Sequence, residues 1–145
     1  MPFYTCIHGK GSLTEPRKQA LAQGITDIHC GVTGAPRHFV HVLFQEYAAS
    51  DCYSGGEPSS VANIRGSIRL GRSQGTKEEM LQRITELWRA VCPETRIADI
   101  VVSLAEIAGT NVMEGGVLLP HPNDDASWLA RNGFASETPA GGAAP

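Results

Sequence analysis

The fold is decided by a stretch that occurs twice, as ALAQGITDIH from Ala20 to His29 and as EMLQRITELW from Glu79 to Trp88. Both share the pattern Gln-x-Ile-Thr followed by an acidic and then an apolar residue. The two copies are 59 positions apart. A second pair, VHVLFQE (Val40 to Glu46) and IVVSLAE (Ile100 to Glu106), recurs at an offset of 60. Because a nearly constant offset holds across two different elements, chance similarity of two amphipathic helices is the weaker explanation. We infer an internal duplication.

Each copy is predicted to form a strand, a helix and a second strand. The strands are expected at 3–9, 38–44, 62–70 and 98–106. The first helix is expected to start at the N-cap Thr14 and to end at Gly31 and Gly34, and the second to start with a Thr76–Glu79 capping box. The apolar stripes of the two helices are Leu21, Ile25, Ile28 and Val32, and Met80, Ile84, Leu87 and Val91.

This order of elements predicts an α/β fold (α+β in some schemes) built from two β-α-β units with right-handed crossovers. The units would make a four-stranded, mainly parallel sheet with both helices on one face. The opposite face would still have apolar side chains to bury, which favours self-association. We expect a single domain over 1–132, with pseudo-repeats at about 2–60 and 62–120, and a disordered tail at 135–145. The Gly- and Ser-rich segment 48–60 is interpreted as a loop and a candidate lid.

Composition excludes several classes of function. The chain has 145 residues, 41% of them hydrophobic, and a net charge of −3 without a basic stripe, so nucleic acid is not an expected partner. No apolar run approaches the ~18 residues of a membrane span, and no signal peptide is recognisable. We therefore expect a soluble, cytoplasmic protein. The four scattered cysteines form no C-x-x-C pair, so neither a metal site nor a cofactor is predicted.

Pro2 stands directly behind the initiator methionine and ahead of an apolar run. Methionine aminopeptidase normally removes Met1 when residue 2 is proline, which would leave Pro2 as a free secondary amine. Such amines titrate near pKa ~8, and burial or nearby cations lower that value. Pro2 is therefore a candidate proton-transfer residue; the alternative is that position 2 tolerates almost any residue.

Two arginines and a histidine are candidate ligands for an anion. Arg69 and Arg72 stand three positions apart at the end of a predicted strand, with Gly71 allowing the second to fold back. The planar guanidinium suits bidentate carboxylate binding, although an ordinary surface pair is the alternative. His29 is a candidate ligand too, or else a cation that complements the dipole at a helix end. The other four histidines lack a motif and are expected to be non-catalytic.

The duplication tests these assignments. The positions that match Pro2, Arg69 and Arg72 in the other copy hold Ala62, Gly9 and Ser12. A structural proline or arginine pair would more readily be repeated in both copies. The asymmetry favours one composite site for each chain, drawing on both halves.

An N-terminal proline on a duplicated β-α-β chain of this length resembles the tautomerase superfamily, and within it the long-chain group around cis-3-chloroacrylic acid dehalogenase. The resemblance runs from Pro2 to about Trp128. It is carried by Pro2, ITDIH ending at His29, FQE at 44–46, IRLGRS with Arg69 and Arg72, and MEGGVLLP with Glu114. It implies a homotrimer that buries the otherwise exposed face of the sheet.

The resemblance also implies roles. Pro2 would transfer the proton, Arg69 and Arg72 would bind the substrate carboxylate with help from His29, and Glu114 would activate water. At two positions where the dehalogenase pattern has tyrosine, this chain has Ser103 and Gly115. Ser103 is retained as a candidate that could hydrogen-bond the water, although a backbone-bonded strand serine is an equal alternative.

These features predict a weak or promiscuous hydratase and dehalogenase of cis-3-haloacrylate-type carboxylates. The first alternative is a keto-enol tautomerase of phenylenolpyruvate-like 2-oxo acids. The second, from a different class, is a non-catalytic trimeric binding protein that keeps the fold. In each case the expected partners are a small carboxylate and further copies of the chain.

Overall fold

The structure is a computed structural model that describes residues 1–133. The tail predicted at 135–145 lies outside the described residues. The chain runs in the order β1 (Phe3–Gly9), α1 (Glu15–Thr33), β2 (His41–Tyr47), β3 (Tyr53–Ser54), β4 (Glu57–Pro58), β5 (Ala62–Arg69), α2 (Gln74–Val91), β6 (Ile100–Ile107), β7 (Met113–Glu114), β8 (Val117–Leu118) and α3 (Asp125–Arg131). Four short 3₁₀ turns lie between them, η1 (Arg37–Phe39), η2 (Ala49–Asp51), η3 (Ile97–Asp99) and η4 (Gly109–Asn111).

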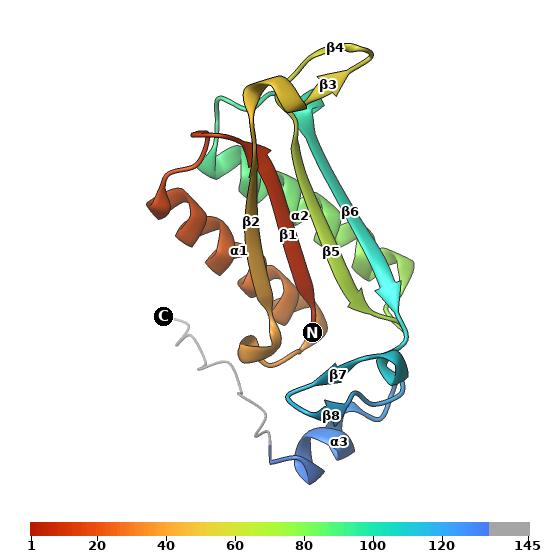
Figure 1. The fold of residues 1–145 in the computed structure, drawn as a ribbon. Helices are drawn as coiled ribbons and strands as arrows, with labels where there is room; N and C mark the ends of the chain where they lie inside the picture. The colour runs from red at the N-terminus through yellow and green to blue at the C-terminus, as the bar shows by residue number, and fades with distance from the viewer. Residues whose placement is uncertain (134–145) are drawn as a thin grey trace.

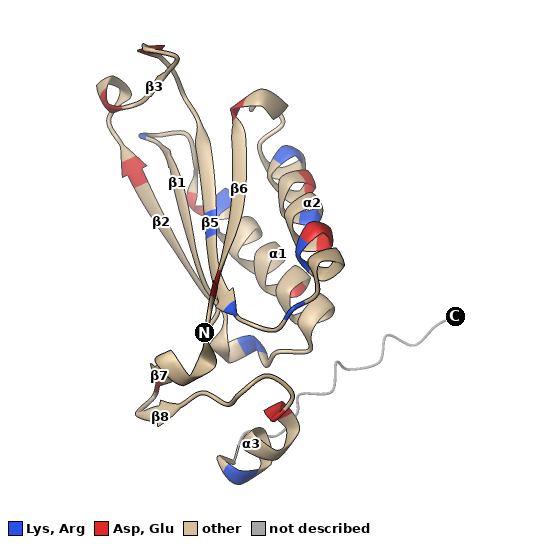
Figure 2. Cartoon of the chain, turned by 90° about the vertical axis from the view of Figure 1, so that its right-hand side faces the viewer, with Lys and Arg blue, Asp and Glu red and all other residues tan. Residues whose placement is uncertain are grey.

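Four strands form one sheet in the order β2-β1-β5-β6. Within each copy the strands are parallel, β1 with β2 and β5 with β6, whereas the central pair β1 and β5 is antiparallel. Helices α1 and α2 pack side by side on one face (Figures 1 and 2). The predicted α/β fold of duplicated β-α-β units, with two helices on one face, is confirmed.

Within the predicted repeats at about 2–60 and 62–120, the structure contains matching elements that the sequence reasoning did not assign. Each outer strand leads into a 3₁₀ turn and then a two-stranded hairpin, β3–β4 in the first copy and β7–β8 in the second. The two hairpins match at an offset of 60, and each turns through a pair of glycines with positive φ. They lie at opposite ends of the sheet (Figure 1). The segment 48–60 thus contains a hairpin that is the counterpart of the one holding Glu114.

Several predicted boundaries are wrong. Helix α2 is capped by Ser73, whose Oγ accepts from the Thr76 N–H at 3.1 Å, so Thr76 lies inside the helix and forms no capping box. The strand predicted at 38–44 begins at His41, because the backbone before it closes the turn η1 with local hydrogen bonds. The same happens before Ile100 with η3. Such local bonds compete with pairing in the sheet for the same backbone groups.

The core lies between the sheet and the two helices. From the strands it takes the side chains of Tyr4, Cys6, Ile64 and Ile68, and from the helices those of Leu21, Ile25, Met80, Ile84 and Trp88. One close approach at its centre limits what residue 66 can be. A Cβ on Gly66 would lie 2.5 Å from Tyr4 Cε1 and 2.7 Å from Leu104 Cδ2. Gly66 therefore makes the space in which the Tyr4 ring lies.

The opposite face of the sheet is open in the single chain. Phe3, Leu43 and Val101 are 43%, 44% and 46% exposed there. Figure 2 shows the sheet edge-on, with the charged residues concentrated on α2 and most of the sheet ribbon uncharged. Strand β6 is covered on one side only within the chain, since exposed residues alternate along it with partly buried ones.

Replacing Gly66 by Ala is expected to lower the free energy of unfolding by about 1–3 kcal/mol, because the added methyl group displaces the Tyr4 ring in a packed core. Urea denaturation followed by circular dichroism measures the change. The matched control is Gly75→Ala on α2, where a Cβ meets nothing closer than 4.0 Å. That variant should be as stable as the parent or up to about 1 kcal/mol more stable. Equal stability of the parent and Gly66→Ala would contradict the packing described.

Candidate active site

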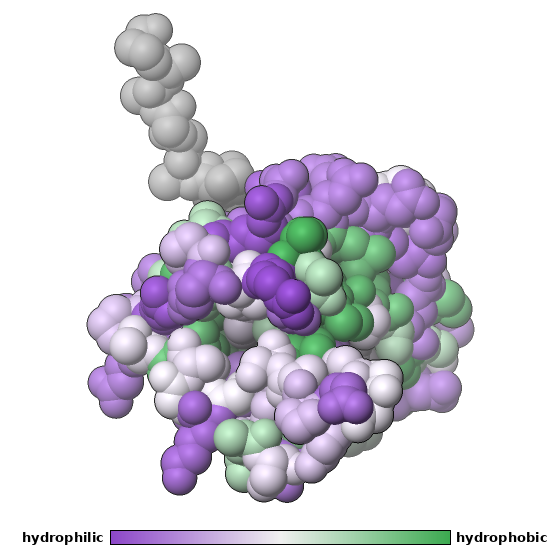
Figure 3. Space-filling model, turned by 90° about the horizontal axis from the view of Figure 1, so that it is seen from above, coloured by the Kyte–Doolittle hydropathy of each residue, from purple (hydrophilic) through white to green (hydrophobic). Residues whose placement is uncertain are grey.

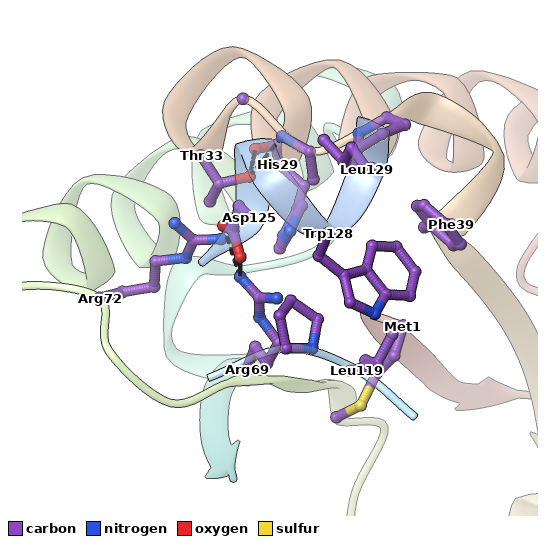
Figure 4. A pocket seen from close by; sticks show the side chains of 14 residues that line it. Met1, His29, Thr33, Phe39, Arg69, Arg72, Leu119, Asp125, Trp128 and Leu129 are labelled. Atoms are coloured by element: carbon purple, nitrogen blue, oxygen red, sulfur yellow. Dashed lines mark hydrogen bonds and ion pairs between the residues drawn. The ribbon is translucent and has the colours of Figure 1, made fainter. Parts of the chain in front are cut away.

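A cavity opens at the end of the sheet where β1 begins and β5 ends. The antiparallel pairing of these strands, with Phe3 opposite Ser67, brings the start of the chain beside the end of β5. Met1, His29, Arg69 and Arg72 all line this cavity, and residues of the C-terminal segment, among them Asp125 and Trp128, complete its wall (Figure 4). All three substrate-binding residues predicted from the sequence are thus brought together with the N-terminus.

The two arginines reach the cavity from β5 and the turn that follows it. Arg69 is the last residue of β5, and Gly71 then adopts φ of 113°, a conformation that favours glycine. Burial, and then the positive charge of Arg69, lowers the pKa of Arg72 below its ordinary value. Arg72 forms no ion pair with any residue of the described part of the chain. Its guanidinium is therefore available to an anion.

Arg69 is already paired. Its Nη2 donates to both oxygens of Asp125, at 2.5 Å and 2.6 Å, and the arginine side chain is only 14% exposed. Figure 4 shows the Asp125 carboxylate between the two arginines. A substrate carboxylate that uses Arg69 has to share or displace this contact.

His29 is buried and hydrogen-bonded from within the core. The Tyr4 hydroxyl and His29 Nδ1 are 2.9 Å apart, and the ring is 3% exposed. Burial, followed by Arg72 and the chain terminus, lowers the pKa of His29 to about 4, so the ring is neutral at pH 7. The interpretation of His29 as a cation at a helix end is wrong, since α1 continues to Thr33 and the ring carries no charge.

The N-terminus lies between Arg69 and Glu114. The Met1 amine contacts the Glu114 carboxylate, and burial, followed by Arg69, lowers the pKa of that amine to about 5. Pro2 is fully buried directly behind Met1. Glu114 also accepts a hydrogen bond of 2.8 Å from His41 Nε2, which the sequence had not connected with the site.

Ser103 and Gly115 lie away from the cavity. Ser103 is exposed in the middle of β6, opposite Arg65 in the strand register, and it does not line the cavity of its own chain. Gly115 is in the tight turn of the β7–β8 hairpin, with φ of 59°. Neither residue lines the cavity, so neither can touch a ligand there directly. Each could act on it only through an intervening residue or in the cavity of another subunit.

Sequence reasoning missed the residues that close the cavity, among them Asp125, Trp128 and Phe39. The Trp128 indole N–H donates to Leu118 O at 2.8 Å, which ties α3 to the β7–β8 hairpin, and its ring lies 6.1 Å from that of Phe39. The run HPNDDASW carries the signal for a helix start. No feature of this run indicates that Asp125 pairs with Arg69, which stands 56 positions earlier in the sequence.

Within residues 1–133 no cluster of three or more His, Cys, Asp or Glu side chains could hold a metal ion. In the same range no helix has the length and apolar character needed to cross a membrane.

Comparisons with known proteins identify the family and the fold. Residues 1–133 match the family model described as a putative oxalocrotonate tautomerase enzyme. No protein with a curated function matches the chain. Among solved structures, native Ps01740 is 39% identical, with a TM-score of 0.76, and the match covers 77% of this chain and 99% of that one.

A second solved structure is N1, a member of the cis-3-chloroacrylic acid dehalogenase family. It is 30% identical, with a TM-score of 0.83 over 88% of this chain and 90% of that one. A fused 4-OT that forms a symmetric trimer is 24% identical, with a TM-score of 0.73 over 81% and 94% of the two chains. This third likeness shows the fold alone. By its sequence, its duplicated fold and these matches, the chain belongs to the tautomerase superfamily, in the group of cis-3-chloroacrylic acid dehalogenase.

Proposed function

We propose that the chain is an enzyme that transfers protons on small carboxylates through Pro2, exposed as the N-terminal residue once Met1 is removed. The observation that carries the proposal is the cavity shared by Met1, His29, Arg69 and Arg72. Loss of Met1 would open the cavity towards the Pro2 nitrogen, which would then be a titratable amine instead of an amide. It would lie close to two guanidinium groups that attract a carboxylate.

Binding of the carboxylate is assigned to Arg72 first. This guanidinium is half-buried and has no ion-pair partner among the described residues, whereas Arg69 is held by Asp125. The neutral His29 would assist as a hydrogen-bond donor. In the tautomer that accepts the Tyr4 hydroxyl proton at Nδ1, the proton of the ring is on Nε2.

The first reaction that we propose is hydration of cis-3-haloacrylate-type acids. Glu114 would take a proton from water, and the hydroxide would add to the β-carbon while the protonated Pro2 gives its proton to the α-carbon. The resulting halohydrin would lose a proton and the halide ion to give malonate semialdehyde. The contact of Glu114 with the chain terminus supports this arrangement. The absence of tyrosine at positions 103 and 115 predicts that turnover is weak or promiscuous.

A second reaction is favoured by the electrostatics of the terminus. Burial, followed by Arg69, lowers the pKa of the Met1 amine to about 5, and both causes would also lower the pKa of the Pro2 amine once Met1 is removed. Neutral Pro2 is the form that abstracts a proton. It would take one from an enol or an α-carbon and return it elsewhere, which is keto-enol tautomerisation of a 2-oxo acid such as phenylenolpyruvate.

We also propose that the chain works as a homotrimer. The open sheet face, with Phe3, Leu43 and Val101 nearly half exposed, would be buried between subunits. Fused 4-OT structures with the same fold are trimers. The exposed Ser103 is on this face and would lie at such an interface.

Replacing Pro2 by Ala is expected to lower kcat by at least about 100-fold, because general acid–base catalysis contributes 10²- to 10⁴-fold. Turnover of cis-3-chloroacrylate and phenylenolpyruvate is measured after mass spectrometry has shown that Met1 is absent. Light scattering checks that the oligomer is unchanged. Retained activity would mean that turnover does not need the secondary amine of Pro2. Met1 still present in the parent protein would favour the non-catalytic binding protein.

The two reactions are separated by Glu114→Gln. Since only the hydration needs a base for water, the variant is expected to lose haloacrylate turnover by about 100-fold or more and to keep tautomerase activity within about threefold. The control is Glu57→Gln on β4, an exposed position of the hairpin at the other end of the sheet. An equal loss of both activities would mean that Glu114 acts on the terminus and not on water.

The contact between Asp125 and Arg69 predicts competition with substrate. Asp125→Asn removes the charge that holds the guanidinium, and KM for either substrate is expected to fall about fivefold, in line with ~1 kcal/mol for a partly exposed ion pair. The control is Asp124→Asn, a neighbouring carboxylate that makes no side-chain cap. A higher KM in Asp125→Asn would mean that Asp125 orients Arg69 for substrate.

A further inference from the structure

A second cavity, of roughly 410 Å³, lies at the opposite end of the sheet, where β1 ends and β5 begins. Its lining repeats that of the first cavity through the internal duplication. His29, Arg69 and Met1 line the first cavity, and their counterparts Trp88, Gly9 and Val61 line the second. Figure 3 views the molecule from the upper end of Figure 1 and shows hydrophobic side chains surrounded by hydrophilic ones.

The second cavity lacks the chemistry of the first. Ala62 occupies the position that matches Pro2, so no terminal amine can form there. Gly9 and Ser12 occupy the positions of the two arginines. This end of the sheet therefore cannot repeat the proposed reaction, and any role that it keeps is a binding role.

Two residues that line the second cavity each hold a buried polar atom with no hydrogen-bond partner among the described residues. These atoms are Nε2 of His8, in a side chain 1% exposed, and the indole nitrogen of Trp88, 2% exposed. Buried polar groups in proteins are nearly always paired, so each calls for a partner. His8 comes from the end of β1 and Trp88 from α2, so residues from both copies contribute one such atom each.

The hydrogen bonds of His8 indicate which ring nitrogen carries the proton. Nδ1 lies 3.0 Å from the Gly9 carbonyl oxygen and 3.0 Å from Ser12 Oγ, and the Ser12 hydroxyl donates its own proton to the same carbonyl at 2.7 Å. The tautomer that fits both contacts has its proton on Nδ1. Nε2 is then an acceptor, whereas the Trp88 indole N–H is a donor. A hydroxyl group can donate to the first and accept from the second.

The charges at this cavity favour an anion. Arg96 is paired with Asp99, and Glu94 with Arg17. Lys10 also lines the cavity, is exposed and forms no ion pair within residues 1–133. The unpaired charge at this opening is therefore positive.

We propose that the second cavity is a binding site, separate from the first, for a small hydroxylated organic acid. The hydroxyl group of the ligand bonds to His8 Nε2 and the Trp88 N–H, its apolar body lies against Val61 and Ala62, and its carboxylate faces Lys10. Because the site has neither the proline nor the arginines, it binds such a ligand without converting it. This inference does not depend on the reaction proposed for the first cavity.

The chain carries its own reporter for each cavity, since its only two tryptophans are Trp88 and Trp128 and the latter lines the first cavity. A ¹⁵N–¹H spectrum of the full chain will show two indole signals, assigned with Trp128→Phe. Titration with 4-hydroxyphenylacetate is expected to shift the Trp88 signal and to saturate. Phenylacetate, which lacks the hydroxyl group, should bind this site about tenfold more weakly, the value of one good hydrogen bond.

Two variants locate the binding. Lys10→Ala is expected to weaken the affinity measured at Trp88 about three- to fivefold at low salt, as for an exposed ion pair. The control Lys18→Ala, on α1 and outside the lining of the cavity, leaves it unchanged. Arg72→Ala should suppress any shift of Trp128 and leave that of Trp88. The proposal is overturned if the Trp88 signal does not move, if its shift disappears in Arg72→Ala, or if both probes bind it equally well. Loss of enzymatic activity alone bears only on the first cavity.

Discussion

The site depends on one constraint, the antiparallel pairing of β1 with β5 at the centre of an otherwise parallel sheet. Each β-α-β unit is parallel within itself, and the two are joined in opposite directions. The first residues of the chain therefore lie beside the last residues of β5, where Arg69 and Arg72 follow. A fully parallel sheet would put the chain terminus and these arginines at opposite ends.

The interior of the fold supports the site through a short series of contacts. Gly66 leaves room for the Tyr4 ring, and the Tyr4 hydroxyl reaches His29 at 2.9 Å. Burial keeps His29 neutral, so the positive charge of the cavity comes from the arginines, one of which is held by Asp125. Arg72 forms no ion pair within residues 1–133, so its positive charge is available to a small carboxylate. The same burial lowers the pKa of the amine that enters the cavity.

The duplication gives the molecule two ends of similar shape and different chemistry. One end has the terminus, the arginines and a C-terminal segment that covers them. The other end has Trp88 in place of His29 and has no counterpart of the two arginines. His8 and Trp88 each have a buried nitrogen there without a partner among the described residues. Since the scaffold positions are shared and the polar ones are not, the difference between the two cavities lies in side chains and not in the backbone.

The sequence by itself determined the duplication, the two amphipathic helices, the four strands and the short set of candidates at Pro2, His29, Arg69, Arg72 and Glu114. Periodicity and repetition are local signals, and they are visible in a single chain. Only the tertiary structure decided that His29 is neutral, that Asp125 holds Arg69 and that Ser103 lies away from the cavity of its own chain. These facts depend on burial and on contacts between residues far apart in the sequence. No local pattern encodes them.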